Sequence, residues 1–99
     1  GGNLEKEYSK LSSRYEDAKA ESQDVSDRIT KLDKVARDLF SEWEKELREI
    51  ETKDLRRRSS QQLDETRNRY EALHTQLKKS EQKMAPVLTR FKDQVLFLK

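Results

Sequence analysis

Hydrophobic residues recur every seven positions along the second half of the chain, and this spacing constrains the fold more than any other feature. The line consists of Leu63, Tyr70, Leu77, Met84, Phe91 and Leu98. A straight α-helix turns once in about 3.6 residues, so a seven-residue period stays on one side only when the helix packs lengthwise against another. The pattern therefore predicts long paired helices.

Residues 4–43 carry a matching series in which steps of four and three alternate. It consists of Leu4, Tyr8, Leu11, Tyr15, Ala18, Ser22, Val25, Ile29, Leu32, Ala36, Leu39 and Trp43. The two series differ in phase, so the register breaks near residue 54. Thr52 and Asp54 are candidate N-cap residues there, because their side-chain oxygens can accept hydrogen bonds from free amides. We expect a helix over about 3–52, a turn at about 53–55 and a helix over about 56–99.

Folding the chain back at this turn brings the two series together. The predicted register faces Trp43 with Thr66 and Tyr15 with Gln94, and it couples Leu39 with Tyr70, Ala36 with Leu73, Leu32 with Leu77, Ile29 with Ser80, Val25 with Met84, Ser22 with Val87 and Ala18 with Phe91. Charge favours the pairing, since residues 1–53 carry 11 basic and 14 acidic side chains whereas residues 54–99 carry 11 and 6. The expected fold class is all-α, a long antiparallel coiled-coil helical hairpin in one domain. Because neither glycine nor proline stands near residue 54, a continuous helix that pairs with a second molecule is an alternative.

Further apolar residues flank the predicted seam and widen its stripe. They are Val35, Phe40, Leu47, Leu88, Val95 and Phe97. A stripe wider than a two-helix contact predicts one more helical partner. The partner is either a second copy, which would give a four-helix bundle homodimer, or the remaining helices of a longer parent chain. The final residues read as helix with no C-cap glycine, so we expect a fragment of a longer protein.

Composition excludes several function classes. The net charge is +2, which is too small to indicate nucleic-acid binding, and the absence of cysteine excludes a thiolate metal site. No stretch approaches the ~20 apolar residues that a membrane span needs. A two-helix rod has no concave site for a nucleophile, a base or a cofactor, so we expect no enzyme.

Three local features are candidates for chemistry. Glu71 and His74 have the spacing of a helical metal site, but a solvated helix surface is the simpler interpretation. Arg56, Arg57 and Arg58 form a basic cluster at the tip of the hairpin, which could contact phosphate or anionic lipid. Trp43 could anchor a partner protein, although its seam position favours a core role. Pro86 interrupts the second helical pattern and predicts a kink, or else a break and restart, at residues 84–85.

Residues 55–63, 84–88 and 91–99, together with 28–29 and 39–44, carry a resemblance to a known family. The most specific part is the run Asp93-Gln94-Val95-Leu96-Phe97-Leu98-Lys99. The chain resembles a bacterial family that is known only as a domain of unknown function, whose Gram-negative members typically begin with an export signal, often of lipoprotein type. The resemblance implies a periplasmic or envelope-associated protein and supplies no catalytic residues.

The sequence thus favours a structural or protein-interaction coiled-coil module of a bacterial envelope protein. Its expected partners are a second copy, the rest of the parent chain or another envelope protein. The alternative is a binder of membrane surfaces or anionic polymers that acts through Arg56, Arg57 and Arg58. We expect no cofactor.

Overall fold

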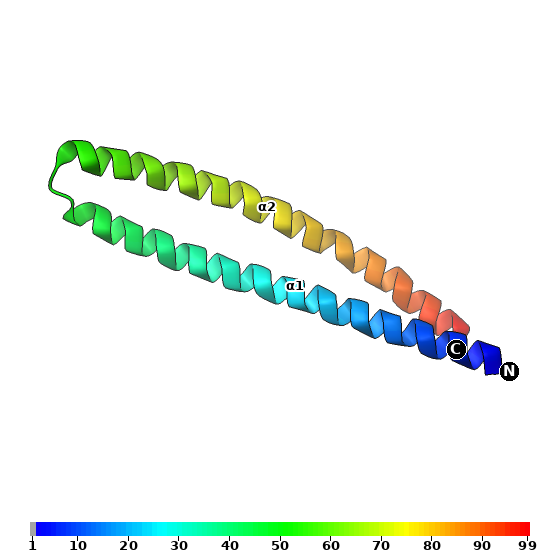
Figure 1. Ribbon diagram of the computed structural model, residues 1–99. Helices are drawn as coiled ribbons and strands as arrows, with labels where there is room; N and C mark the ends of the chain where they lie inside the picture. The colour runs from blue at the N-terminus through cyan, green and yellow to red at the C-terminus, as the bar shows by residue number, and fades with distance from the viewer. Residues whose placement is uncertain (1) are drawn as a thin grey trace. The chain divides into compact units, whose positions relative to one another are not determined.

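The computed structural model describes residues 2–99 and folds them into two α-helices (Figure 1). Helix α1 spans Gly2–Glu49 and helix α2 spans Lys53–Leu98, and the described residues contain no strand. The predicted all-α helical hairpin is confirmed. Because the chain turns back between the two helices, the alternative of one continuous helix is wrong.

The turn occupies residues 50–52, earlier than the predicted 53–55. The Ile50 amide donates to the Leu47 carbonyl at 3.2 Å, which tightens the last turn of α1. The Arg56 amide donates to the Thr52 carbonyl at 2.9 Å, so Thr52 rather than Asp54 takes the N-cap position of α2. No residue between 2 and 99 has a positive φ, and the turn therefore needs no glycine.

Charged side chains one helical turn apart lie along the outer surfaces. Arg28 lies 3.1 Å from Asp24, and Lys34 lies 2.8 Å from Asp38. The hydrogen bond from Lys34, with its positive charge, holds the pKa of the Asp38 carboxyl below its usual value. Such exposed pairs add little to stability individually, so packing of the apolar residues has to hold the helices.

The chain divides into two compact units. The unit that contains the turn comprises Ile29–Lys78, and we call it the turn unit. Its core cluster consists of Ala36, Phe40 and Leu63, with Leu63 only 3% exposed. Trp43, Leu47 and Tyr70 are partly buried and pack against the cluster. The small Ala36 side chain beside large rings is the kind of packing that lets two helices approach closely.

In the turn unit, α1 buries two predicted seam positions, Ile29 and Ala36, but its other buried position differs from the prediction. Leu32 and Leu39 belong to the predicted seam, but both are exposed, whereas Phe40 is buried. The buried residues Ile29, Ala36 and Phe40 follow the turn of a straight helix, which drifts from a strict heptad pattern. Phe40 also has more apolar surface to remove from water than Leu39 has.

On α2, the heptad line itself is confirmed within the turn unit. Leu63 is buried, and Tyr70 and Leu77 are half-buried. The companion position Leu73 is exposed, and its neighbour His74 is half-buried instead. The predicted couple of Ala36 with Leu73 is therefore wrong.

The register of the pairing is shifted as well. Trp43 Nε1 donates to Ser59 Oγ at 3.0 Å, so Trp43 faces Ser59 and not Thr66. The cause is the position of the turn. An earlier turn sets each residue of α1 opposite an earlier residue of α2.

The second compact unit, the terminal unit, joins residues 2–28 to Lys79–Lys99. Val95 is its buried apolar residue in the described part of the chain. The rings of Tyr15 and Phe91 pack with centroids 5.8 Å apart, so Tyr15 meets Phe91 where Gln94 was expected. On the heptad line of α2, Met84, Phe91 and Leu98 are half-buried.

Helix α2 passes through Pro86 without interruption. The predicted break and restart is therefore wrong, and the kink stays a prediction. Pro86 cannot donate a backbone hydrogen bond, while one turn further on the Thr89 hydroxyl donates to the Ala85 carbonyl at 3.1 Å. Within residues 2–99 neither helix has the apolar length that crossing a membrane requires.

Candidate functional site

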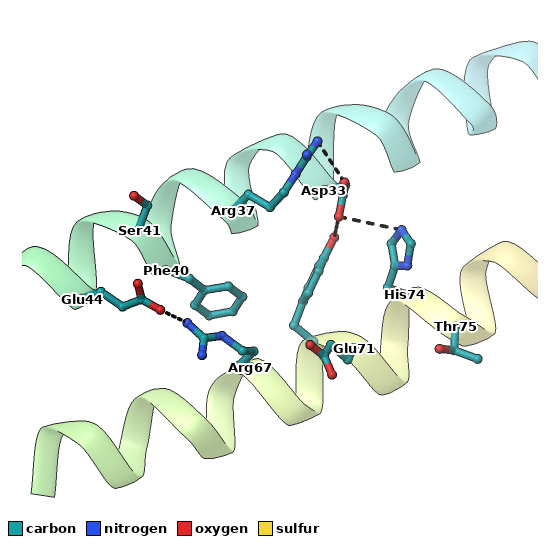
Figure 2. Close-up of a pocket in the computed structure, with 10 residues that line it drawn as sticks. Asp33, Arg37, Phe40, Ser41, Glu44, Arg67, Glu71, His74 and Thr75 are labelled. Atoms are coloured by element: carbon teal, nitrogen blue, oxygen red, sulfur yellow. Dashed lines mark hydrogen bonds and ion pairs between the residues drawn. The ribbon is translucent and has the colours of Figure 1, made fainter. Parts of the chain in front are cut away.

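An open groove of about 560 Å³ lies between α1 and α2 in the turn unit (Figure 2). Both helices contribute polar and aromatic side chains to it. From α1 come Asp33, Arg37, Phe40, Ser41 and Glu44, and from α2 come Arg67, Tyr70, Glu71, His74 and Thr75. We call this surface the polar groove.

Asp33 is the centre of one network in the polar groove. The Tyr70 hydroxyl donates to Asp33 Oδ1 at 3.0 Å, and His74 Nε2 lies 3.9 Å from the same oxygen. Arg37 approaches the other carboxylate oxygen at 3.1 Å. Burial raises the pKa of the Tyr70 hydroxyl, and the hydrogen bond to Asp33 and its negative charge add to the rise. The carboxylate of α1 thereby binds the phenol of α2 and joins the two helices.

A second network surrounds Arg67. Its guanidinium donates to the Glu44 carboxylate across the helix pair and lies 5.5 Å from the centre of the Phe40 ring (Figure 2). The Phe40 and Tyr70 rings meet edge to face with centroids 5.9 Å apart. Charge pairing and ring packing therefore act on the same side chains, which favours a fixed geometry between the helices.

Glu71 and His74, the predicted metal-binding pair, do not form an ion site with other ligands. His74 lies beside Asp33, and its ring packs against that of Tyr70 at a tilt, with centroids 5.8 Å apart. Within residues 2–99, no three carboxylate, imidazole or thiolate side chains lie close enough to hold a metal ion. Since Asp33, Glu44, Arg37 and Arg67 pair with one another, the polar groove is arranged to hold the helices together.

Exposed aliphatic residues lie on a different side of the turn unit. Leu32, Val35 and Leu39 of α1 are 40%, 64% and 54% exposed, and Leu73 of α2 is 51% exposed. Leu32, Leu39 and Leu73 each precede a residue of the polar groove by one position, and one position turns a helix by about 100°. They therefore point away from the polar groove. We call these four residues the aliphatic face.

Trp43 borders the aliphatic face. A shallow groove of about 180 Å³ is lined by Leu39, Glu42, Trp43 and Glu46. The indole is half-buried, and its N–H is occupied by Ser59. The tryptophan thus combines the core role that its position predicted with an edge that adjoins the exposed leucines.

The basic cluster at the start of α2 is partly neutralised. The Asp54 carboxylate lies 2.7 Å from Arg57 Nη2 and 3.3 Å from Arg58 Nε. A carboxylate in the first turn of a helix is also favoured by the helix dipole. An anionic surface that binds Arg56, Arg57 and Arg58 would have to compete with Asp54.

The six predicted flanking residues have different environments. Val35 and Phe97 are exposed, Phe97 to 88%. Phe40 and Val95 are buried, and Leu47 and Leu88 are half-buried. The two buried residues form part of the contact between the helices. The sequence had predicted that Phe40 and Val95 flank this contact.

Sequence reasoning did not single out Asp33 or Arg67. Asp33 follows Leu32, which any hydrophobic pattern prefers as the buried position. The available signal was the spacing of Asp33 and Arg37, one helical turn apart, on the same side as Phe40. A tyrosine on the opposing helix would then complete the polar contact.

In the terminal unit, an apolar groove of about 490 Å³ is lined by Leu11, Asp93, Gln94, Phe97 and Leu98. A smaller one of about 220 Å³ is lined by Leu4, Glu5, Tyr8, Leu98 and Lys99. The predicted register left Leu4 and Tyr8 without a facing residue on α2. The earlier turn sets both of them beside Leu98.

Two antiparallel helices with a paired polar groove and a separate aliphatic face define a helical-hairpin module. The chain matches the model of the family described as "Protein of unknown function (DUF2959)" over residues 1–99, and it belongs to that family. The predicted membership of an uncharacterised family is thereby confirmed. Neither a curated protein nor a solved structure matches the chain.

Proposed function

We propose that this chain is a structural or protein-interaction module of a bacterial envelope protein and that it holds a helical partner against its aliphatic face. The observation that carries the proposal is the exposure of Leu32, Val35, Leu39 and Leu73. Keeping apolar area in water costs about 25 cal/mol per Å², so a partner that covers these side chains is favoured. Steps of three and four along α1 suit a helix as that partner.

The envelope location is supported by the resemblance of residues 93–99 to exported proteins. Fractionation of cells that produce the natural full-length protein tests it. Recovery with the envelope fraction is expected, and recovery with the cytosol would contradict this part of the proposal.

The proposed role involves no catalysis, because Asp33 and Glu44 of the polar groove already bind side chains of the facing helix. Binding of an anionic surface by Arg56, Arg57 and Arg58 is a weaker candidate, since Asp54 engages two of these arginines. Sedimentation with anionic vesicles tests that candidate. Loss of vesicle binding on replacement of the three arginines by alanine would support it.

Capture experiments with the natural full-length protein test the interaction role. The bait is compared with its Leu32→Gln/Leu39→Gln/Leu73→Gln variant in extracts of the bacterial envelope. The matched control, Lys45→Gln/Arg48→Gln, changes exposed residues of α1 away from the aliphatic face. Circular dichroism confirms that each bait is helical. We expect the triple variant alone to lose its partner, and equal capture by all three baits would refute the proposal.

A further inference from the structure

We infer that the partner of the aliphatic face is a second copy of this chain, which packs parallel to the first so that α1 of each copy lies on α2 of the other. The inference rests on the proposed function, because it names the partner of the same surface. It concerns the turn unit alone.

The first argument is the charge at the edges of the aliphatic face. Glu42 and Glu46 share a shallow groove with Leu39, which gives the α1 side an acidic edge. On α2, Arg69 precedes Leu73 by one helical turn, and Arg58 precedes Arg69 by about three turns, so both lie on the side of Leu73. Glu65, seven residues after Arg58 and four before Arg69, lies on the same line, so the α2 side has an edge that is net basic by one charge. One surface thus carries both members of a complementary pair of edges.

A surface of this kind complements itself under two-fold symmetry. In a symmetric dimer the same patch of both copies forms the contact, so each residue contact occurs twice. A two-fold axis parallel to the helices sets α1 of one copy on α2 of the other. The acidic edge of each hairpin then faces the net basic edge of the other, and Leu32 of each copy faces Leu73 of the other.

The register within one hairpin fixes which charges meet. Trp43 bonds Ser59 across the pair, so residues just after Trp43 lie level with the first turns of α2. An axis parallel to the helices leaves that level unchanged in the dimer. Glu46 of one copy is therefore level with Arg58 of the other.

The other symmetric arrangement is disfavoured by the same charges. A two-fold axis across the helices sets α1 on α1 and points the two turns in opposite directions. It places the edge with Glu42 and Glu46 against the same edge of the second copy. Like charges in a contact are unfavourable. The charge distribution thus selects the parallel arrangement.

Disulfide trapping tests the arrangement directly, since the chain has no cysteine. Asp33 contacts both Tyr70 and His74, so Leu32 lies nearly level with Leu73. The single variants Leu32→Cys and Leu73→Cys are oxidised separately and as a mixture. We expect a covalent dimer in the mixture that contains one chain of each kind. A dimer of Leu32→Cys alone, without the mixed product, would overturn the arrangement.

Charge reversal supplies a second test that involves no cysteine. Glu46→Lys should weaken dimerisation by about tenfold, because the symmetric contact contains the pair twice. Addition of Arg58→Glu should restore most of the loss. Asp64→Lys, in place of Glu46→Lys, is the control for a charge change at an exposed position of α2 away from the face. Failure of the double variant to recover would overturn the pairing of Glu46 with Arg58.

Sedimentation separates the inference from the proposed function. A concentration-dependent dimer that is abolished by Leu32→Gln/Leu39→Gln/Leu73→Gln supports the inference. A monomer at hundreds of micromolar overturns it. If the monomeric protein still captures another envelope protein through the aliphatic face, the proposed function stands without the second copy. If the Leu32→Gln/Leu39→Gln/Leu73→Gln variant changes neither dimer formation nor capture of an envelope protein, the inference and the proposed function are both wrong.

Discussion

Asp33 is the side chain on which the polar contacts between the helices converge. It accepts a hydrogen bond from Tyr70 and lies beside both Arg37 and His74. A charged carboxylate in this position needs these partners, because an unpaired charge beside packed rings lowers the stability of the fold. Variants of its partners therefore report directly on the geometry of the polar groove.

Tyr70→Phe removes the hydrogen bond to Asp33 and retains the ring. We expect a loss of about 1 kcal/mol in the free energy of unfolding near neutral pH, since the acceptor is charged but only partly buried. The pKa of Tyr70 is raised above 10.0, so the unfolded chain loses this proton first as the pH rises. The stability that Tyr70 contributes is complete below 10.0 and declines above it. Urea unfolding at several pH values should show that the difference in the free energy of unfolding between wild type and Tyr70→Phe becomes smaller above pH 10.0.

Tyr8→Phe is the control for removal of a phenol at the same pH values, because Tyr8 belongs to the terminal unit and Asp33 to the turn unit. At each pH, the difference in the free energy of unfolding between wild type and Tyr70→Phe is compared with the difference between wild type and this control. A Tyr70→Phe gap that stays constant from neutral to strongly alkaline pH would contradict the assigned hydrogen bond.

Ser59→Ala leaves the Trp43 indole N–H without its acceptor. We expect a loss of about 1 kcal/mol, partly masked because alanine favours a helix more than serine does. Ser80→Ala, at an exposed position of α2, measures the gain from helix propensity alone. The difference between the two variants in urea unfolding is the value of the bond. Tryptophan fluorescence should shift to the red in Ser59→Ala, and equal behaviour of both variants would show that the bond contributes nothing.

At the scale of the helices, sequence could predict the number and type of elements more securely than their faces. The heptad line through Leu63 and Tyr70 marked the inner side of α2 correctly. On α1 two stripes overlap, one through Leu32 and Leu39 and the other through Asp33 and Phe40. A hydrophobicity pattern selects the first because it counts Asp33 as a surface residue. The hydrogen bond from Tyr70 on the facing helix helps to stabilise that half-buried carboxylate. Which residue faces Asp33 depends on the position of the turn, and a single sequence does not define that position.

The candidate site was harder than the helices to predict from the sequence, for the same reason. The charged residues of the polar groove come from two helices, and each looks like part of a solvated surface when its own helix is considered alone. Leu32, Leu39 and Leu73 of the aliphatic face were assigned to the buried seam because of their spacing, whereas Val35 was predicted to flank it. Both assignments reverse once Phe40 is placed inward.

Pro86→Ala tests the cost of the proline within α2. Pro86 is exposed, so the substitution changes the backbone more than the packing. We expect an increase of about 1–3 kcal/mol in the free energy of unfolding, because alanine restores a donor to the carbonyl one turn earlier. Val87→Ala, at the next exposed position, controls for a change of side chain alone. A decrease in stability would mean that the helix needs the proline at this point.

For the molecule as a whole, self-association should couple stability to concentration. Binding of a second folded copy stabilises the native state by mass action. We therefore expect the midpoint of thermal unfolding to rise by a few degrees for each tenfold increase in protein concentration. Calorimetry at several concentrations checks this, and the Leu32→Gln/Leu39→Gln/Leu73→Gln variant is the control whose midpoint should stay constant.

The turn at residues 50–52 has a practical consequence for work on this family. Its backbone needs no left-handed residue, and Glu51 and Thr52 are exposed. Lengthening a flexible connection costs only about 0.6 kcal/mol per doubling. A peptide epitope inserted after Glu51 would therefore be displayed at the junction while both helices keep their pairing, and it would offer a label that leaves the aliphatic face untouched.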